Sequence, residues 1–77
     1  MDNICMKYSY HIVVELIDNK LNQINECIEK SKFIENKRRH QISYKLYENF
    51  RKFILGSDDH IVELSFGVYQ DLTTPYT

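Results

Sequence analysis

The sequence predicts an all-α fold, a small three-helix domain. No Gly or Pro occurs before Gly56, and this absence favours long helices over a turn-rich β domain. Apolar residues also recur every three to four positions, as they do on the buried face of an amphipathic helix. The 77 residues are expected to form a single domain, residues 1–77.

The first helix is predicted over residues 9–31, with Ser9 as its N-cap. Its apolar positions form one stripe: Tyr10, Val13, Val14, Ile17, Leu21, Ile24 and Ile28. A competing interpretation makes residues 8–16 a strand, because Tyr, Ile and Val favour strands. The helical stripe continues unbroken to Ile28, so the helix is preferred.

The second helix is predicted over residues 37–55, with Asn36 as its N-cap. Gly56 fits the position after the helix, where a positive φ costs Gly nothing. The expected buried stripe is Ile42, Leu46, Phe50 and Phe53, flanked by Tyr47 and Ile54. The centre of the outer, polar face is expected to hold Lys37, His40, Tyr44, Glu48 and Arg51.

The third element, residues 58–71, has two interpretations. Ser57 resembles an N-cap followed by Asp58 and Asp59 in a first helical turn, where the helix dipole favours acids. The same region alternates as a strand would, with Val62, Leu64, Phe66 and Val68 on one side. The capping pattern favours a third helix, followed by a short tail over residues 73–77.

The sequence indicates neither catalysis nor metal binding. His11, His40 and His60 lie on different predicted elements, and no His or Cys spacing fits a zinc site. No Gly-rich loop is present to hold a phosphate. Cys5 and Cys27 are too few for a disulfide framework and are expected to be reduced. We therefore expect a protein that is not an enzyme and needs no metal or cofactor.

Composition also suggests a setting for the protein. The longest apolar run, residues 12–14, cannot span a bilayer, and residues 1–7 lack the apolar core of a signal peptide. A cytoplasmic protein without membrane contact is expected. The absence of Ala and Trp, with abundant Ile, Asn, Lys and Tyr, indicates an A+T-rich genome such as that of a phage or mobile element. The small core predicts a homodimer.

Residues 36–55 stand out by charge, with six cations and only one acid, Glu48, in a chain of net charge −1. Arg38, Lys45 and Lys52 are spaced by seven and should line one edge of the helix. Tyr44 is expected at the centre of the polar face, and exposed Tyr near Arg is typical of binding surfaces. The candidate partner-binding residues are Arg38, Tyr44, Lys45, Arg51 and Lys52.

Three interpretations of this basic helix stay open. It can be an ordinary solvated face, a surface that binds a partner protein, or a nucleic-acid-binding helix. The element after the turn is acidic, with Asp58, Asp59, Glu63 and Asp71, and would repel phosphate. The separation of positive and negative segments favours a protein partner that this chain modulates or inhibits. The alternative is a nucleic-acid-binding regulator that uses residues 37–55.

Two short segments, residues 27–33 and 59–64, resemble parts of the small Hha-type helical regulators that bind nucleoid proteins. The segments are further apart here by about the length of a helix. Because the resemblance covers a small fraction of the chain, no function is transferred from it.

Overall fold

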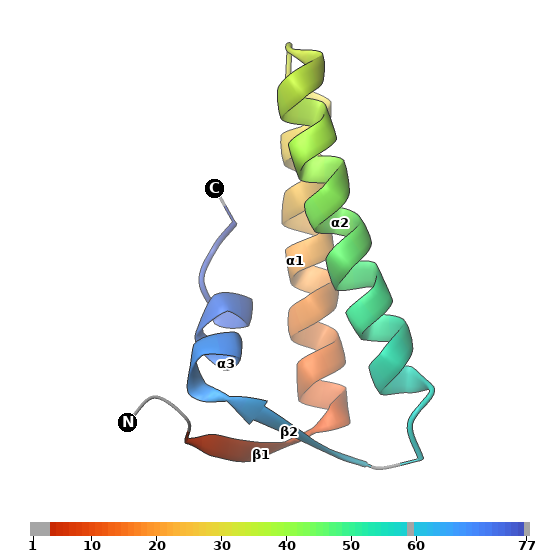
Figure 1. Ribbon diagram of the computed structural model, residues 1–77, viewed down its shortest axis with the longest axis vertical. Helices are drawn as coiled ribbons and strands as arrows, with labels where there is room; N and C mark the ends of the chain where they lie inside the picture. Colours follow the sequence, from red (N-terminus) through yellow and green to blue (C-terminus); the bar gives the residue numbers. More distant parts are fainter. Residues whose placement is uncertain (1–3, 59, 77) are drawn as a thin grey trace.

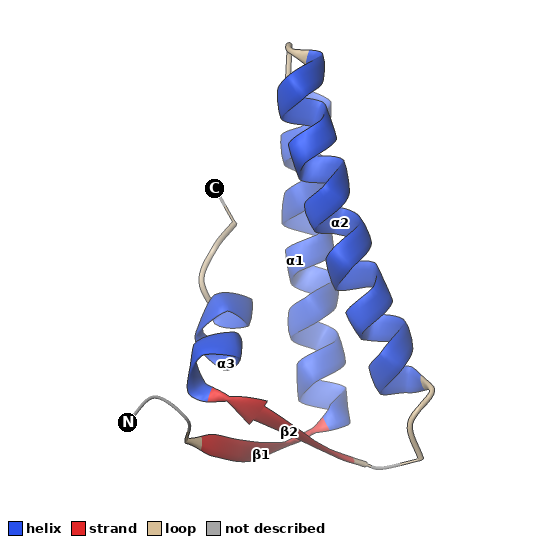
Figure 2. Ribbon diagram, in the orientation of Figure 1, coloured by secondary structure: helices blue, strands red, loops and turns tan. Residues whose placement is uncertain are grey.

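The computed structural model describes residues 4–58 and 60–76, which form three helices and a two-stranded sheet (Figures 1 and 2). The elements follow in the order β1 (Cys5–Ser9), α1 (Tyr10–Lys30), α2 (Ile34–Leu55), β2 (Ile61–Ser65) and α3 (Phe66–Thr73). Helices α1 and α2 form a long hairpin, the sheet crosses its open end, and α3 lies beside α1 (Figure 1). The prediction of a small, mostly helical domain is confirmed.

The boundaries of the α1–α2 hairpin differ from the predicted ones mainly at the turn. Helix α1 follows Ser9, as predicted, although the Ser9 side chain makes no capping hydrogen bond. Helix α2 begins at Ile34, so Asn36 lies inside the helix and is not its N-cap. Gly56 ends α2 with φ of −82°, which any residue can adopt, so the expected positive φ is also wrong.

Strands β1 and β2 pair in antiparallel fashion, from Cys5 opposite Ser65 to Ser9 opposite Ile61. The sequence pattern predicts no strand over β1 and favours a helix where β2 lies, because the two partners are far apart in the chain. Pairing of the β-branched Ile61 and Val62 with β1 outweighs the capping pattern at Ser57. Asp58 precedes the strand in a loop, and the predicted role of Asp59 lies outside the described residues.

Helix α3 forms only the second half of the predicted third helix. Its N-cap is Ser65, whose hydroxyl oxygen accepts a hydrogen bond from the Val68 backbone N–H at 3.3 Å. Tyr69 of α3 stacks on Tyr8 of β1, with ring centroids 4.4 Å apart and planes 6° from parallel. The third element is therefore a strand followed by a helix, and each of the two interpretations was right for one half of it.

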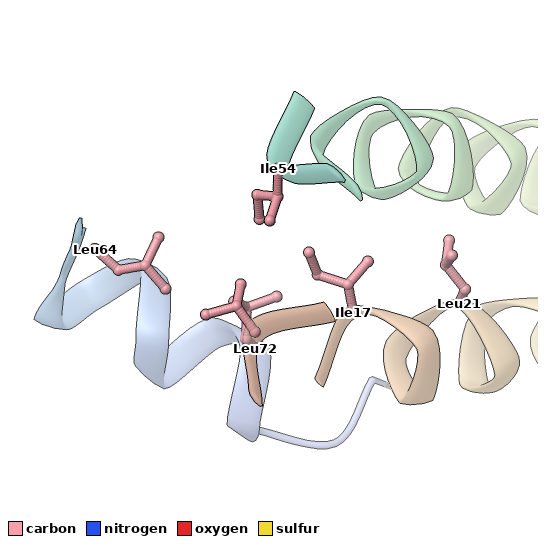
Figure 3. Close-up of a cluster of buried hydrophobic side chains, with 6 residues drawn as sticks. Ile17, Leu21, Ile54, Leu64 and Leu72 are labelled. Carbon is pink, nitrogen blue, oxygen red and sulfur yellow. The ribbon is translucent and has the colours of Figure 1, made fainter. Parts of the chain in front are cut away.

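The hydrophobic core collects side chains from both long helices, from β2 and from α3 (Figure 3). Its buried members are Val13, Ile17, Leu21, Ile54, Leu64 and Leu72. Burying each of these aliphatic side chains contributes roughly 1.5–3 kcal/mol. Because four elements contribute to one cluster, we expect them to fold as a unit.

The C-terminal tail, residues 74–76, binds to both helices of the hairpin. Lys20 of α1 donates a hydrogen bond to the Thr74 carbonyl, and the Tyr76 backbone N–H donates to Gln23 Oε1 at 2.7 Å. The Tyr76 hydroxyl lies 2.6 Å from Nδ1 of His40 on α2. These contacts leave Lys20 only 4% exposed. Burial lowers the pKa of Lys20, and the nearby Asp71 carboxylate partly offsets this effect.

The lowered pKa of Lys20 predicts a pH dependence of stability. A base whose pKa is lower in the folded state binds fewer protons when folded, so stability rises with pH between the folded pKa and the ordinary value of 10.5. Wild type should therefore gain stability relative to Lys20→Met as the pH rises through this window. Thermal unfolding of both proteins across alkaline pH measures the difference. A constant difference would show that Lys20 has an ordinary pKa.

Candidate partner-binding surface

Helix α2 packs on α1 and the C-terminal tail through a seam that differs from the predicted one. This inner seam consists of His40, Tyr44, Tyr47, Arg51 and Ile54, which alternate spacings of four and three residues. Ile54 is buried, and Tyr44 and Tyr47 are half-buried against the core. A 4-3 spacing is the pattern of residues that keep one face of a helix against its partner. The predicted buried stripe of α2 is therefore wrong for Ile42, Leu46 and Phe53, whereas Phe50 and the flanking Tyr47 and Ile54 do pack in or against the core.

The predicted stripe instead faces solvent along most of its length. Ile42 is 63% exposed, Leu46 is 65% exposed and Phe53 is 76% exposed. At 100° per residue these three side chains lie on the side of α2 opposite the inner seam. Phe50, at the edge of the stripe, is half-buried and packs against the core. We call Ile42, Leu46 and Phe53 the outer stripe.

The seam uses amphipathic side chains where an aliphatic stripe was expected. Tyr, His and Arg have apolar stems or rings that pack and polar tips that need partners. In α2 these tips find partners: His40 lies against Tyr76, and the Arg51 guanidinium lies against Asp18. Burial raises the pKa of Tyr47, and the Asp71 carboxylate and Tyr76 add to this effect. Because the inner seam supplies the packing against α1 and the tail, the more apolar outer stripe stays exposed to solvent.

Arg51, a predicted partner-binding residue, contacts α1. Its Nε donates to Asp18 Oδ1 at 2.7 Å, and the two side chains are 37% and 47% exposed. Because water screens a pair this exposed, the pair is expected to stabilise the fold by only about 0.5 kcal/mol.

A double-mutant cycle with Arg51→Ala and Asp18→Ala measures this coupling. The stability changes should be nearly additive, with a coupling free energy of about 0.5 kcal/mol in urea unfolding. A coupling above about 2 kcal/mol would mean that the pair behaves as a buried one.

Arg38, Lys45 and Lys52 are exposed along one edge of α2, as the spacing predicted. We call them the cation row. Glu48 Oε1 lies 3.5 Å from the Lys45 amine and 3.9 Å from the Lys52 amine, so one acid is shared by two cations. The row lies directly beside the outer stripe, by the same 100° geometry. Cations and large apolar side chains therefore form one continuous surface.

Tyr44 does not lie on this surface. It is half-buried and lines two hollows along the α1–α2 seam, one beside Asp18 and Asn22 and one beside Asn25 and Ile28. The structure thus groups Arg38, Lys45 and Lys52 along one edge and places Tyr44 and Arg51 in the seam with α1, and Lys45 lines the second hollow together with Tyr44. The apolar spacing of α2 predicts that the outer stripe is buried. The 4-3 spacing of the inner seam was the signal that could have identified the face of α2 that packs on α1.

Three further observations bear on function. Across residues 4–58 and 60–76, no group of three His, Cys, Asp or Glu side chains converges as a metal site would require. The helices within these ranges are too short or too polar to cross a bilayer. No family model, curated protein or solved structure matches the chain.

Proposed function

We propose that this chain is a non-enzymatic protein of the cytoplasm that binds a partner protein through the outer face of α2 and modulates it. The outer face comprises the outer stripe and the cation row. The observation that carries the proposal is the exposure of Ile42, Leu46 and Phe53 on a single helical face. Isolated exposed apolar residues are ordinary, but an aligned set with a polar edge is typical of a docking surface.

The arrangement also supports a protein partner over nucleic acid. Phosphate binding needs cations, and Arg38, Lys45 and Lys52 supply a row of them. It does not need three large apolar side chains in line beside that row. Protein interfaces commonly combine an apolar centre with a charged rim. Self-association, predicted from the small core, stays a separate prediction.

Affinity capture with matched variants tests the proposal. Wild-type protein, Leu46→Asp and Ile12→Asp are immobilised and exposed to nuclease-treated lysate of the source organism. Ile12 is a matched control because it is a half-exposed aliphatic residue on α1, away from the outer face. We expect Leu46→Asp to lose a protein that wild type and Ile12→Asp both capture. Equal capture by all three would contradict the proposal.

The nucleic-acid alternative predicts a different pattern. Binding to duplex or single-stranded DNA would weaken steeply with salt and with Lys45→Glu or Lys52→Glu. It would change little with Leu46→Ala, which keeps the charge. DNA binding with that pattern, together with no Leu46-dependent capture, would replace the proposed function.

A further inference from the structure

We infer that the partner presents to α2 a helix whose apolar stripe is bordered by carboxylates, an inference that rests on the proposed function. The outer stripe extends over twelve residues, from Ile42 to Phe53, which corresponds to a rise of about 16 Å or three helical turns. Ile42 and Leu46 are four residues apart and Phe53 follows seven residues later, and these spacings keep the three side chains on one helical face. A single partner helix can cover a stripe of this length.

The charges beside the stripe select the chemistry of that helix. The Lys45 and Lys52 side chains are 66% and 69% exposed, and their shared partner Glu48 lies on the side towards the inner seam. Surface ion pairs of this kind contribute little free energy, so carboxylates of a partner can replace Glu48 at small cost. Arg38, at the start of the row, makes no ion pair among the described residues. The row therefore attracts acids.

A second copy of the chain fits this surface poorly. If two α2 helices pair in antiparallel fashion about a twofold axis, their cation rows lie on the same side and repel. If they pair in parallel, each row meets the opposite flank of the stripe, which carries Arg39, Ser43 and Phe50 but no acid. The other acid of α2, Glu35, lies two turns before the stripe.

A membrane surface also fits poorly, although basic amphipathic helices often bind anionic lipids. Asn49 lies between the outer stripe and the cation row by the 100° geometry, so the apolar face is bordered by polar groups on this side. Three apolar side chains in line offer a membrane little area to bury. A partner helix can bind the Asn49 amide, and a polar residue at the border of an apolar helical face can fix the register of the pair.

The test uses two synthetic amphipathic helices of about six turns with identical Leu stripes, one flanked by Glu and the other by Lys. Their binding to the full chain is followed by fluorescence anisotropy. We expect the Glu-flanked helix to bind at least about tenfold more tightly. Leu46→Asp should abolish this binding, and Lys45→Glu with Lys52→Glu should weaken it about tenfold and improve binding of the Lys-flanked helix. Ile12→Asp is the control that should change neither affinity.

Other outcomes overturn the inference. Equal affinity for both helices would show that carboxylates are not selected. A Leu46-dependent dimer in sedimentation, with no peptide binding, would identify a second copy as the occupant. Leu46-dependent binding to vesicles rich in phosphatidylserine, with no peptide binding, would identify a membrane. Failure to bind either peptide, with none of these results, would also reject it. The proposed function itself survives if lysate capture still depends on Leu46.

Discussion

Replacing Ile54 with Ala is expected to lower the free energy of unfolding by about 2–4 kcal/mol. Replacing its neighbour Phe53 with Ala should change it by less than about 0.5 kcal/mol. Ile54 is 3% exposed and belongs to the core, whereas Phe53 is 76% exposed. The difference arises because only Ile54 leaves a cavity when it is shortened. Urea unfolding followed by circular dichroism measures both values.

The pair is a sharp comparison because both residues lie in the last turn of α2. The larger side chain, Phe53, is the one expected to contribute little to stability. An argument from side-chain size and hydrophobicity alone would predict the reverse. If Ile54→Ala proves too unstable to measure, Ile54→Val should still cost about 0.5–1.5 kcal/mol. A larger loss from Phe53→Ala than from Ile54→Ala would place the outer stripe against α1 and reject the observed rotation of α2.

Replacing Leu72 with Asp is expected to destabilise the domain by more than about 3 kcal/mol, since a buried carboxylate without a partner is costly. Leu72 of α3 is 4% exposed and meets the side chains of α1, α2 and β2 in one cluster. A core this small supplies only a few kcal/mol of net stability, so the variant should be largely unfolded at room temperature. Circular dichroism at 222 nm would then show loss of the long helices as well.

Val68→Asp is the matched control for this substitution. Val68 lies on the same short helix but is 41% exposed, so its replacement should cost no more than about 1 kcal/mol. If Leu72→Asp kept the full helical signal of the α1–α2 hairpin, the hairpin would be stable without α3. The core would then not couple the four elements.

The first helix was predictable because its seam is aliphatic. Val13, Ile17 and Leu21 recur at helical spacing and all are buried, so the apolar stripe and the buried face coincide. In α2, the most apolar stripe and the buried face lie on different sides of the helix. Its outer stripe is more apolar than its inner seam, and a rule that places the most apolar stripe in the core chooses the wrong side.

The pairing of the two strands was not predictable for a different reason. The pairing of Met6 with Leu64 and Tyr8 with Val62 joins opposite ends of the chain, and no local pattern announces a partner more than fifty residues away. Local signals were correct only where they did not compete with this pairing, as in α3 after Ser65. The cation row could be read from its spacing of seven. The association of that row with exposed apolar residues required the orientation of α2.

Helix α2 has two distinct faces, and we expect one to stabilise the fold and the other to bind a partner. The inner seam holds the helix against α1 and the tail, and its residues are expected to respond in unfolding experiments. The outer stripe adds little to the fold, and in water it exposes apolar area that a partner can bury at roughly 25 cal/mol per Å². Substitutions on the outer face should therefore affect binding without affecting folding.

Solvent accessibility of side chains measured by NMR tests the orientation of α2 most directly. A soluble paramagnetic probe broadens the signals of side chains that it can reach. The structure predicts strong broadening for Ile42, Leu46 and Phe53, and protection for Ile54 and Ile17. Protection of Ile42 and Leu46 together with strong broadening of Ile54 would contradict the account, because the outer stripe would then face the core.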